Sequence, residues 1–158
     1  MPGSKPLAVR VLEQRKVRFE QFEFDPSIRS AEEVARAVGM PPETVFKTLV
    51  IEQDPPRGKP FLVMMPSTAE VDLRVLAASL ELKKLRMASH AEAEGHTGLK
   101  VGGISALALL NSGFTVLIDH SALGFDEILV SAGQRGMDLR LAVADLLRLT
   151  GARSVLTR

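Results

Sequence analysis

The sequence predicts a mixed α/β (α+β) fold in a single domain, residues 1–158, with an irregular, barrel-like sheet and flanking helices. Its 158 residues are typical of one compact domain around one core. The hydrophobic and charged fractions, 46% and 25%, are those of a folded globular protein. Segments with strand and helix periodicity alternate without a regular βαβ cadence, which argues against a doubly wound parallel sheet.

The first two predicted elements are a helix and a strand. Residues 6–15 indicate a short helix, with Pro6 in its first turn. Residues 17–24 indicate a strand whose apolar side chains change phase by one position, as a β-bulge produces. Asp25 and Pro26 end this strand, because proline cannot donate to a ladder.

A second helix and a hairpin follow. Ser30 and Glu33 form a capping-box pattern, and Gly39 marks the end of the helix that they begin. The runs 46–52 and 61–66 are strand-like and flank a charged loop rich in proline and glycine. We therefore expect an antiparallel pair of strands here.

The second half of the chain predicts short elements between turn signals. Asp72 caps a helix that runs through Leu80. The expected strands or strand-like pieces are 83–89, 98–105, 115–119, 127–131 and 137–141. The other expected helical segments are a turn at 91–94 and a closing helix at 141–149.

Composition excludes several functional classes. Without cysteine the chain has no disulfide framework, thiolate nucleophile or cysteine zinc site. Its net charge of +1 does not give the general positive field of a nucleic-acid binder, so any RNA contact is local or shared with a partner. No apolar run is long enough to cross a bilayer, and the first residues lack the apolar region of a signal peptide. We expect a cytoplasmic protein with no membrane association.

Metal and serine-nucleophile chemistry have little support in the pattern. His90, His96 and His120 lack the close spacing of metal ligands, so we expect no metal site. No GxSxG elbow is present to place a nucleophilic serine. Acidic residues lie mostly on expected exposed helix faces, and no pair of them stands out as acid and base.

Lys47 interrupts an otherwise apolar strand. Alternation puts it on the face of Val45 and Leu49. It is either a substrate-binding cation that faces a cleft or a lysine whose ammonium reaches water from a strand end. The pattern favours neither.

Two further segments combine glycine with polar residues. Gly102 and Gly103 lie between apolar residues, where they either let backbone amides approach a ligand or form a tight bend; the residues alone favour the bend. Ser131 and Asp138 lie at strand ends around a segment in which two glycines flank Arg135. This segment is either a hairpin turn or one wall of a polar pocket.

Together these segments resemble the YbaK/EbsC family of prolyl-tRNA editing proteins. The resemblance runs in order over nearly the whole chain. It rests on VFKTLV (45–50), FLVMMPSTAEVDL (61–73), KKLRMA (83–88), TGLKVGGIS (97–105), TVLID (115–119) and ILVSAGQRGMDLRL (128–141). The three glycine- or lysine-containing motifs in this order are specific, although each alone would not be.

The resemblance implies a trans-editing aminoacyl-tRNA deacylase with a mixed, barrel-like α/β fold. Such proteins hydrolyse the ester of tRNA(Pro) mischarged with cysteine or alanine, because a synthetase pocket made for proline does not firmly reject residues of smaller or similar size. The implied partners are the acceptor end of the misacylated tRNA(Pro) and prolyl-tRNA synthetase, and no cofactor is implied. The alternative is a non-catalytic module that binds aminoacyl-adenosine or a nucleotide and acts with that synthetase.

The resemblance also implies roles for individual residues. Lys47 would hold the aminoacyl-adenosine by its charge, and the backbone of the glycine segment would bind the ester carbonyl and the developing oxyanion. An aminoacyl ester is already activated, so orientation and oxyanion stabilisation could suffice, and a cysteinyl substrate could attack with its own thiol. The implied catalytic residues are Lys47, Gly102 and Gly103; the implied substrate-binding residues are Phe22, Asp25, Ile104, Ser105, Ser131 and Asp138.

Overall fold

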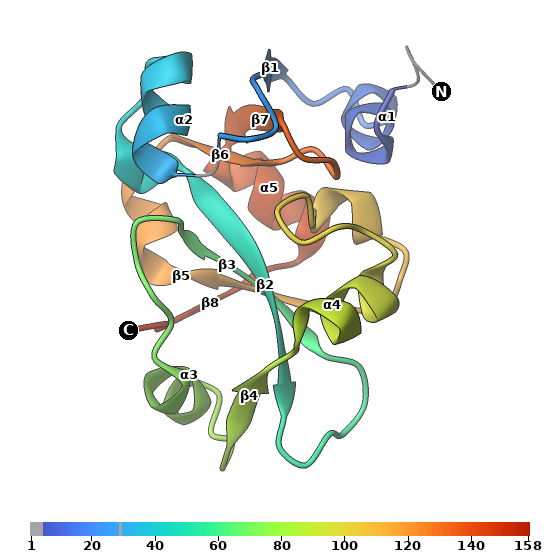
Figure 1. The fold of residues 1–158 in the computed structure, drawn as a ribbon, viewed down its shortest axis with the longest axis vertical. Helices are drawn as coiled ribbons and strands as arrows, with labels where there is room; N and C mark the ends of the chain where they lie inside the picture. The colour runs from blue at the N-terminus through green and yellow to red at the C-terminus, as the bar shows by residue number, and fades with distance from the viewer. Residues whose placement is uncertain (1–4, 29) are drawn as a thin grey trace.

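The computed structural model describes residues 5–28 and 30–158 and shows a mixed α/β fold (Figure 1). The strands are β1 (Phe19–Glu23), β2 (Phe46–Gln53), β3 (Phe61–Pro66), β4 (Leu85–Met87), β5 (Thr115–Asp119), β6 (Glu127–Ser131), β7 (Met137–Ala142) and β8 (Arg153–Val155). The α-helices are α1 (Leu7–Gln14), α2 (Ala31–Val38), α3 (Leu73–Ser79), α4 (His90–Thr97) and α5 (Val143–Thr150). Short 3₁₀ turns lie at Pro42–Thr44, Leu107–Leu109 and His120–Gly124.

The strands form two sheets. The smaller is antiparallel, in the order β1-β7-β6. The larger has the order β4-β2-β3-β5-β8, with β2 antiparallel to both neighbours and β5 parallel to both of its own. A parallel bridge between Val45 and Leu129 links the sheets where β2 begins. The predicted fold class is confirmed, with its strands divided between two sheets that do not close.

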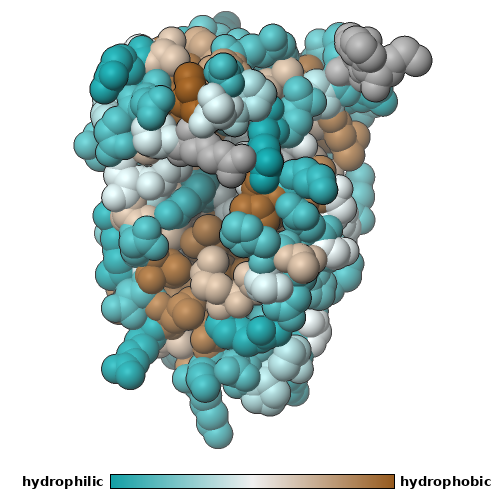
Figure 2. Space-filling model, in the orientation of Figure 1, coloured by the Kyte–Doolittle hydropathy of each residue, from teal (hydrophilic) through white to brown (hydrophobic). Residues whose placement is uncertain are grey.

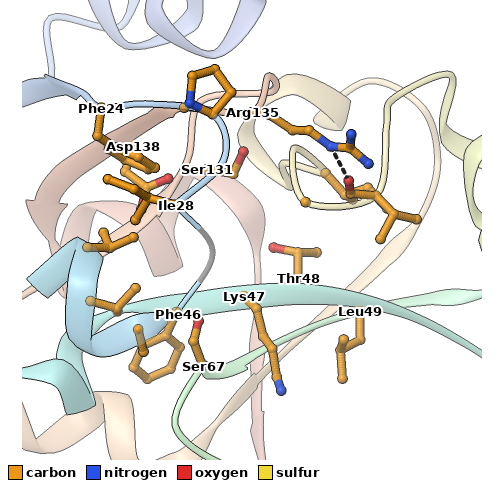
Figure 3. A pocket seen from close by; sticks show the side chains of 18 residues that line it. Phe24, Ile28, Phe46, Lys47, Thr48, Leu49, Ser67, Ser131, Arg135 and Asp138 are labelled. Carbon is orange, nitrogen blue, oxygen red and sulfur yellow. Dashed lines mark hydrogen bonds between the residues drawn. The ribbon is translucent and has the colours of Figure 1, made fainter.

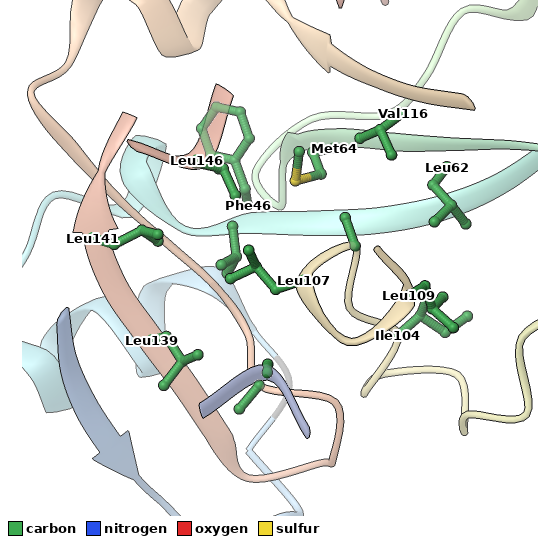
Figure 4. Packing of buried hydrophobic residues seen from close by; sticks show 14 of the residues in the cluster. Phe46, Leu62, Met64, Ile104, Leu107, Leu109, Val116, Leu139, Leu141 and Leu146 are labelled. Atoms are coloured by element: carbon green, nitrogen blue, oxygen red, sulfur yellow. The ribbon is translucent and has the colours of Figure 1, made fainter. Parts of the chain in front are cut away.

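Apolar residues fill both faces of the larger sheet. Leu62 and Met64 of β3 belong to the main core, together with Leu139 of β7 (Figure 4). Val63 points to the opposite face and packs with Leu76 of α3. A strand covered on both faces is apolar at every position, and this is why FLVMMP shows no polar alternation.

The predicted bulge in the first strand is wrong. The β1–β7 ladder runs without interruption from Phe19 opposite Leu141 to Glu23 opposite Met137. Phe19 packs against the main core, whereas Phe22 packs against a separate cluster under α2. The apolar residues change phase because each face of this regular strand packs against a different apolar cluster.

Three other predicted elements also differ from the structure. Residues 98–105 form no strand; Gly98 ends α4 in the left-handed conformation, with φ of 73°, and turns and irregular backbone follow. Helix α4 is longer than the predicted turn, because Ser89 and Glu92 form a capping box at its start. The closing helix begins at Val143 because β7 continues to Ala142, and β8 had no counterpart in the prediction.

Hydrophilic side chains cover most of the face seen in Figure 2, and apolar ones gather toward its middle and lower part. In the described part of the chain, the large apolar side chains that are exposed are Leu7, Met87, Leu123 and Leu156. Within residues 5–28 and 30–158, no helix combines the length and the apolar character needed to cross a bilayer.

Candidate active site

A cavity of about 350 Å³ lies between the start of β2 and the turn that joins β6 to β7 (Figure 3). Residues 45–49 line it, and two other segments contribute to its wall. The glycine loop is defined here as residues 98–106, and the hairpin turn as residues 132–136. The segment 24–28 and helix α2 complete the lining, which is largely apolar. A mostly apolar cavity with a few polar groups is the usual form of a small-ligand site.

The structure brings five of the nine predicted site residues to this cavity. They come from three separate parts of the chain, which explains why their proximity needs the tertiary fold. The five lining residues are Lys47, Gly102, Ile104, Ser131 and Asp138. The four that do not line it are Phe22, Asp25, Gly103 and Ser105.

Gly103 and Ser105 hold the glycine loop in place. A Cβ on Gly103 would lie 2.8–2.9 Å from backbone atoms of Gln134 and Arg135, so only glycine permits this approach of the loop to the hairpin turn. The Gly103 N–H already donates to the Lys100 carbonyl at 2.8 Å. The Ser105 hydroxyl is buried and accepts a bond of 3.1 Å from the Ala108 N–H.

Phe22 and Asp25 lie beside the cavity lining. Phe22 is opposite Asp138 in the β1–β7 register, and its ring lies 5.3 Å from the guanidinium carbon of Arg140. Asp25 accepts a hydrogen bond of 2.9 Å from the Ser27 N–H, and this bond lowers the pKa of its exposed carboxyl. Asp25 thus stabilises the turn after β1.

Lys47 lines the cavity from β2 and is half-buried. Its ammonium donates a hydrogen bond of 2.7 Å to the carbonyl oxygen of Ala69, in the segment after β3. In the view of Figure 3 the side chain points away from Asp138. The bond to Ala69 uses one of the three donors of the ammonium, so its position is fixed while donor capacity remains.

Asp138 is a desolvated carboxylate on the opposite side of the cavity. Burial raises its pKa from 3.8 to about 6. It forms no salt bridge with any residue that the structure describes. Ser131 lies directly opposite in the β6–β7 ladder, and its hydroxyl accepts a bond of 3.1 Å from the Gly133 N–H. A cation that entered the cavity would find a carboxylate without a counter-ion.

Val101 is held through both of its backbone groups, the N–H and the carbonyl that it shares with the Gly102 peptide. The Val101 N–H donates to the Glu94 carboxylate at 3.0 Å, and this bond lowers the pKa of Glu94. Arg135 donates from Nε to the Val101 carbonyl at 2.8 Å, the bond drawn in Figure 3. Gly102 has φ of 93°, which favours glycine. Among the described residues its N–H has no backbone partner.

Sequence reasoning missed three polar residues of the lining: Thr48, Ser67 and Arg135. Alternation places Thr48 on the face opposite Lys47, but the cavity surrounds the start of β2 and takes both. Ser67 comes directly after β3, and its N–H bonds the Val45 carbonyl at 2.7 Å. Only Arg135 had a signal, since it lies between the two glycines of the hairpin turn.

The histidines lie elsewhere. His96 is 4.0 Å from Glu52, His120 is 3.8 Å from Asp119, and neither lines the cavity. In the part of the chain that the structure describes, no three His, Asp or Glu side chains are grouped closely enough to hold a metal ion.

Comparison with known proteins gives the family of this chain. Residues 25–149 match the family described as the aminoacyl-tRNA editing domain. A candidate Cys-tRNA(Pro)/Cys-tRNA(Cys) deacylase of Enterococcus faecalis, EbsC, is 34% identical over 148 residues, which cover 92% of this chain and 88% of that protein.

Two further comparisons point the same way. A proline–tRNA ligase of Acidithiobacillus ferrooxidans is 31% identical over 114 residues, 72% of this chain but 19% of the ligase. A crystal structure of a candidate trans-editing enzyme for prolyl-tRNA synthetase superimposes with a TM-score of 0.81 and 26% identity over 99% of both chains. The chain belongs to the aminoacyl-tRNA editing domain family.

Proposed function

We propose that the cavity binds the 3′-terminal aminoacyl-adenosine of tRNA(Pro) mischarged with cysteine or alanine and positions its ester for cleavage. The chain is an aminoacyl-tRNA hydrolase of the editing family, in accord with the prediction from sequence. The observation that carries the choice of site is the meeting of Lys47, Gly102 and Asp138 at one cavity.

Asp138 is the group that recognises the amino acid. The α-amino group of an aminoacyl ester is a cation, and Asp138 is a half-buried carboxylate without a salt bridge to any described residue. Binding the ammonium replaces the water that the carboxylate lost on burial. Ser131, directly opposite, offers a hydroxyl to the same end of the substrate. Ile104 and other apolar lining residues suit a small side chain such as that of alanine or cysteine.

The glycine loop stabilises the reacting carbonyl. When water adds to the ester carbon, charge develops on the carbonyl oxygen, and the bond to the ribose oxygen then breaks to release the tRNA hydroxyl. The Gly102 N–H is the donor that we assign to this charge. The Gly103 N–H, which bonds Lys100, instead fixes the loop. The family resemblance implies a catalytic role for both glycines, whereas we assign oxyanion binding to Gly102 and support of the loop to Gly103.

Lys47 supplies a fixed positive charge on the other side of the substrate. Its bond to Ala69 holds the ammonium in one place, so little conformational freedom is lost when a ligand binds. A cysteinyl substrate has a second route, in which its thiol attacks its own ester and forms a thiolactone as the ribose hydroxyl leaves. Orientation alone accelerates such an intramolecular step.

Prolyl-tRNA synthetase is the partner that we propose for delivery of the tRNA. The net charge of +1 gives no long-range attraction to RNA, and phosphate contacts normally dominate affinity for nucleic acid. A synthetase that already holds the mischarged tRNA would supply these phosphate contacts, so this chain would not need to. We therefore expect the rate of deacylation at low enzyme concentration to increase when the synthetase is present.

The test is deacylation of Cys-tRNA(Pro), Ala-tRNA(Pro) and Pro-tRNA(Pro) by the wild type, Lys47→Ala and Lys83→Ala. Lys83 is an exposed lysine near the far end of the β2–β3 hairpin and serves as the matched control. We expect cleavage of at least one mischarged tRNA, loss of most of the rate in Lys47→Ala and an unchanged rate in Lys83→Ala. No cleavage of any of the three, with and without the synthetase, would favour the binding module instead.

A further inference from the structure

Arg135 connects the two segments that form the polar side of the cavity. Its Nε donates to the Val101 carbonyl at 2.8 Å, between residues 34 positions apart in the sequence. Its side chain also packs over Gly102, since a Cβ on that glycine would lie 3.3 Å from Nε. Figure 3 shows this side chain reaching from the hairpin turn to the glycine loop.

The bond to Val101 acts on the peptide that carries the Gly102 N–H. The Val101 carbonyl and the Gly102 N–H belong to one planar, trans unit, in which the two groups point in opposite directions. A donor that fixes the carbonyl therefore fixes the direction of the N–H. It also polarises the peptide, which strengthens the N–H as a donor.

Most donors of Arg135 are left for a ligand. A guanidinium has five N–H groups, and the bond to Val101 uses one. Arg86, Arg140 and Arg148 each pair with a carboxylate, whereas within the described ranges Arg135 forms no ion pair. Arg135 is exposed yet lines the cavity, so its side chain lies at the rim. Paired N–H groups in a planar fork match the oxygens of a phosphate.

We propose that Arg135 is a positioning residue that holds the Val101–Gly102 peptide with Nε and binds the phosphate of the terminal nucleotide with its two terminal nitrogens. The proposal rests on the function proposed above, because the 3′-terminal adenosine carries that phosphate on the same ribose as the reacting ester. One side chain thus links recognition of the RNA backbone to the geometry of the donor that stabilises the oxyanion.

The test compares 3′-O-alanyl-adenosine with the same ester bearing a 5′-phosphate. For the wild type we expect the phosphate to lower KM about tenfold, the size expected of charge-assisted hydrogen bonds. Arg135→Gln should lose this preference and should also lower kcat on both esters. Arg135→Lys should keep part of the preference but show the lowered kcat, because an ammonium lacks the planar fork.

The control is Arg57→Gln, an exposed arginine in the loop between β2 and β3, which should behave as the wild type. Because Arg135 is exposed, the melting temperature should not change in Arg135→Gln. A phosphate preference that survives in Arg135→Gln, or an unchanged kcat, would overturn the proposal.

A binding measurement separates this proposal from the proposed function. Calorimetry with adenosine 5′-monophosphate and adenosine requires no turnover. If the wild type cleaves no ester but binds the monophosphate more tightly in an Arg135-dependent way, the deacylase function fails and the phosphate role of Arg135 stands. If the wild type cleaves its substrates and binds both ligands equally, the phosphate role fails alone.

Discussion

Two aspartates at strand ends have pKa values shifted in opposite directions by their surroundings. Asp119, at the end of β5, is fully buried, and Asp138, at the start of β7, is half-buried in the cavity wall. Burial acts to raise the pKa of Asp119. Hydrogen bonds from Ser121 and Thr157 outweigh that effect and hold the pKa below its ordinary value.

Among residues 5–28 and 30–158, no side chain or N–H group donates a hydrogen bond to the carboxylate of Asp138. Burial alone raises its pKa to about 6. Asp119 accepts a hydrogen bond of 2.5 Å from the Thr157 hydroxyl, and this bond connects Thr157 to β5. Asp119 therefore stabilises the fold. The comparison supports the proposed role of Asp138, because its carboxylate lacks the hydrogen bonds that satisfy the more deeply buried Asp119.

The largest expected effect is on stability, in Asp119→Ala. Removal of the carboxylate leaves the Ser121 and Thr157 hydroxyls without their acceptor, one of them in a fully buried residue. We expect the free energy of unfolding to fall by about 3 kcal/mol, as measured in urea. The kcat of the remaining folded protein should be unchanged. If the variant is as stable as the wild type, the hydrogen bonds of Asp119 do not stabilise the fold and the contrast with Asp138 is wrong.

Asp138→Asn should lower the activity without lowering the stability. We expect kcat/KM on a mischarged tRNA(Pro) to fall about 100-fold at neutral pH, since the charge that binds the α-ammonium is gone. Stability should be equal or higher, by at most about 3 kcal/mol, because the folded protein no longer holds a desolvated charge. An N-acetylated aminoacyl-tRNA, which lacks the cation, is the control and should be cleaved equally by both proteins.

The pH dependence follows from the raised pKa of Asp138. The folded protein holds a proton there up to about pH 6, whereas the unfolded chain releases it near its ordinary value of 3.8. Its contribution to stability is therefore present below the unfolded pKa and lost as pH rises toward 6. Conversely, kcat/KM needs the ionised form and should rise about tenfold from pH 5 to 7. A flat rate profile over this range would contradict the assignment.

The smallest expected effect is that of Phe22→Ala. Phe22 is directly opposite Asp138 in β1, and side chains in such a pair lie on the same face. Loss of the ring admits water and should lower the midpoint of the rate profile by less than about one pH unit. Phe19→Ala is the matched control in the same strand, since Phe19 packs against the main core. An equal shift in both variants would mean that the ring of Phe22 does not set the pKa of Asp138.

Elements with local signals could be predicted from the sequence. Ser30 and Gly39 cap α2 as their residue types indicate, with Gly39 at φ of 74°. The β2–β3 hairpin follows from two apolar runs around a charged loop. These features depend on residues that are close in the sequence, so the local sequence pattern predicts them.

The glycine loop could not be predicted in this way. Its apolar residues resemble a strand, but its path depends on the contact of Gly103 with Gln134 and on the Arg135 bond to Val101, about 30 residues away. The direction of the Lys47 side chain is not predictable for the same reason, because its partner Ala69 is 22 positions distant. The family resemblance predicts a set of site residues, but which of them line the cavity and which support it is a tertiary property.

The most direct test of the central contrast is the pKa of the Asp138 carboxyl, measured by carbon-13 NMR titration in the free protein and with a non-hydrolysable aminoacyl-adenosine analogue. Assignment would come from the loss of the resonance in Asp138→Asn. The account predicts a pKa of about 6 in the free protein. It predicts a clear decrease when an analogue with an α-amino group binds, and no decrease with its N-acetylated form. A pKa near the ordinary value in the free protein, or one that the amino group does not lower, would contradict it.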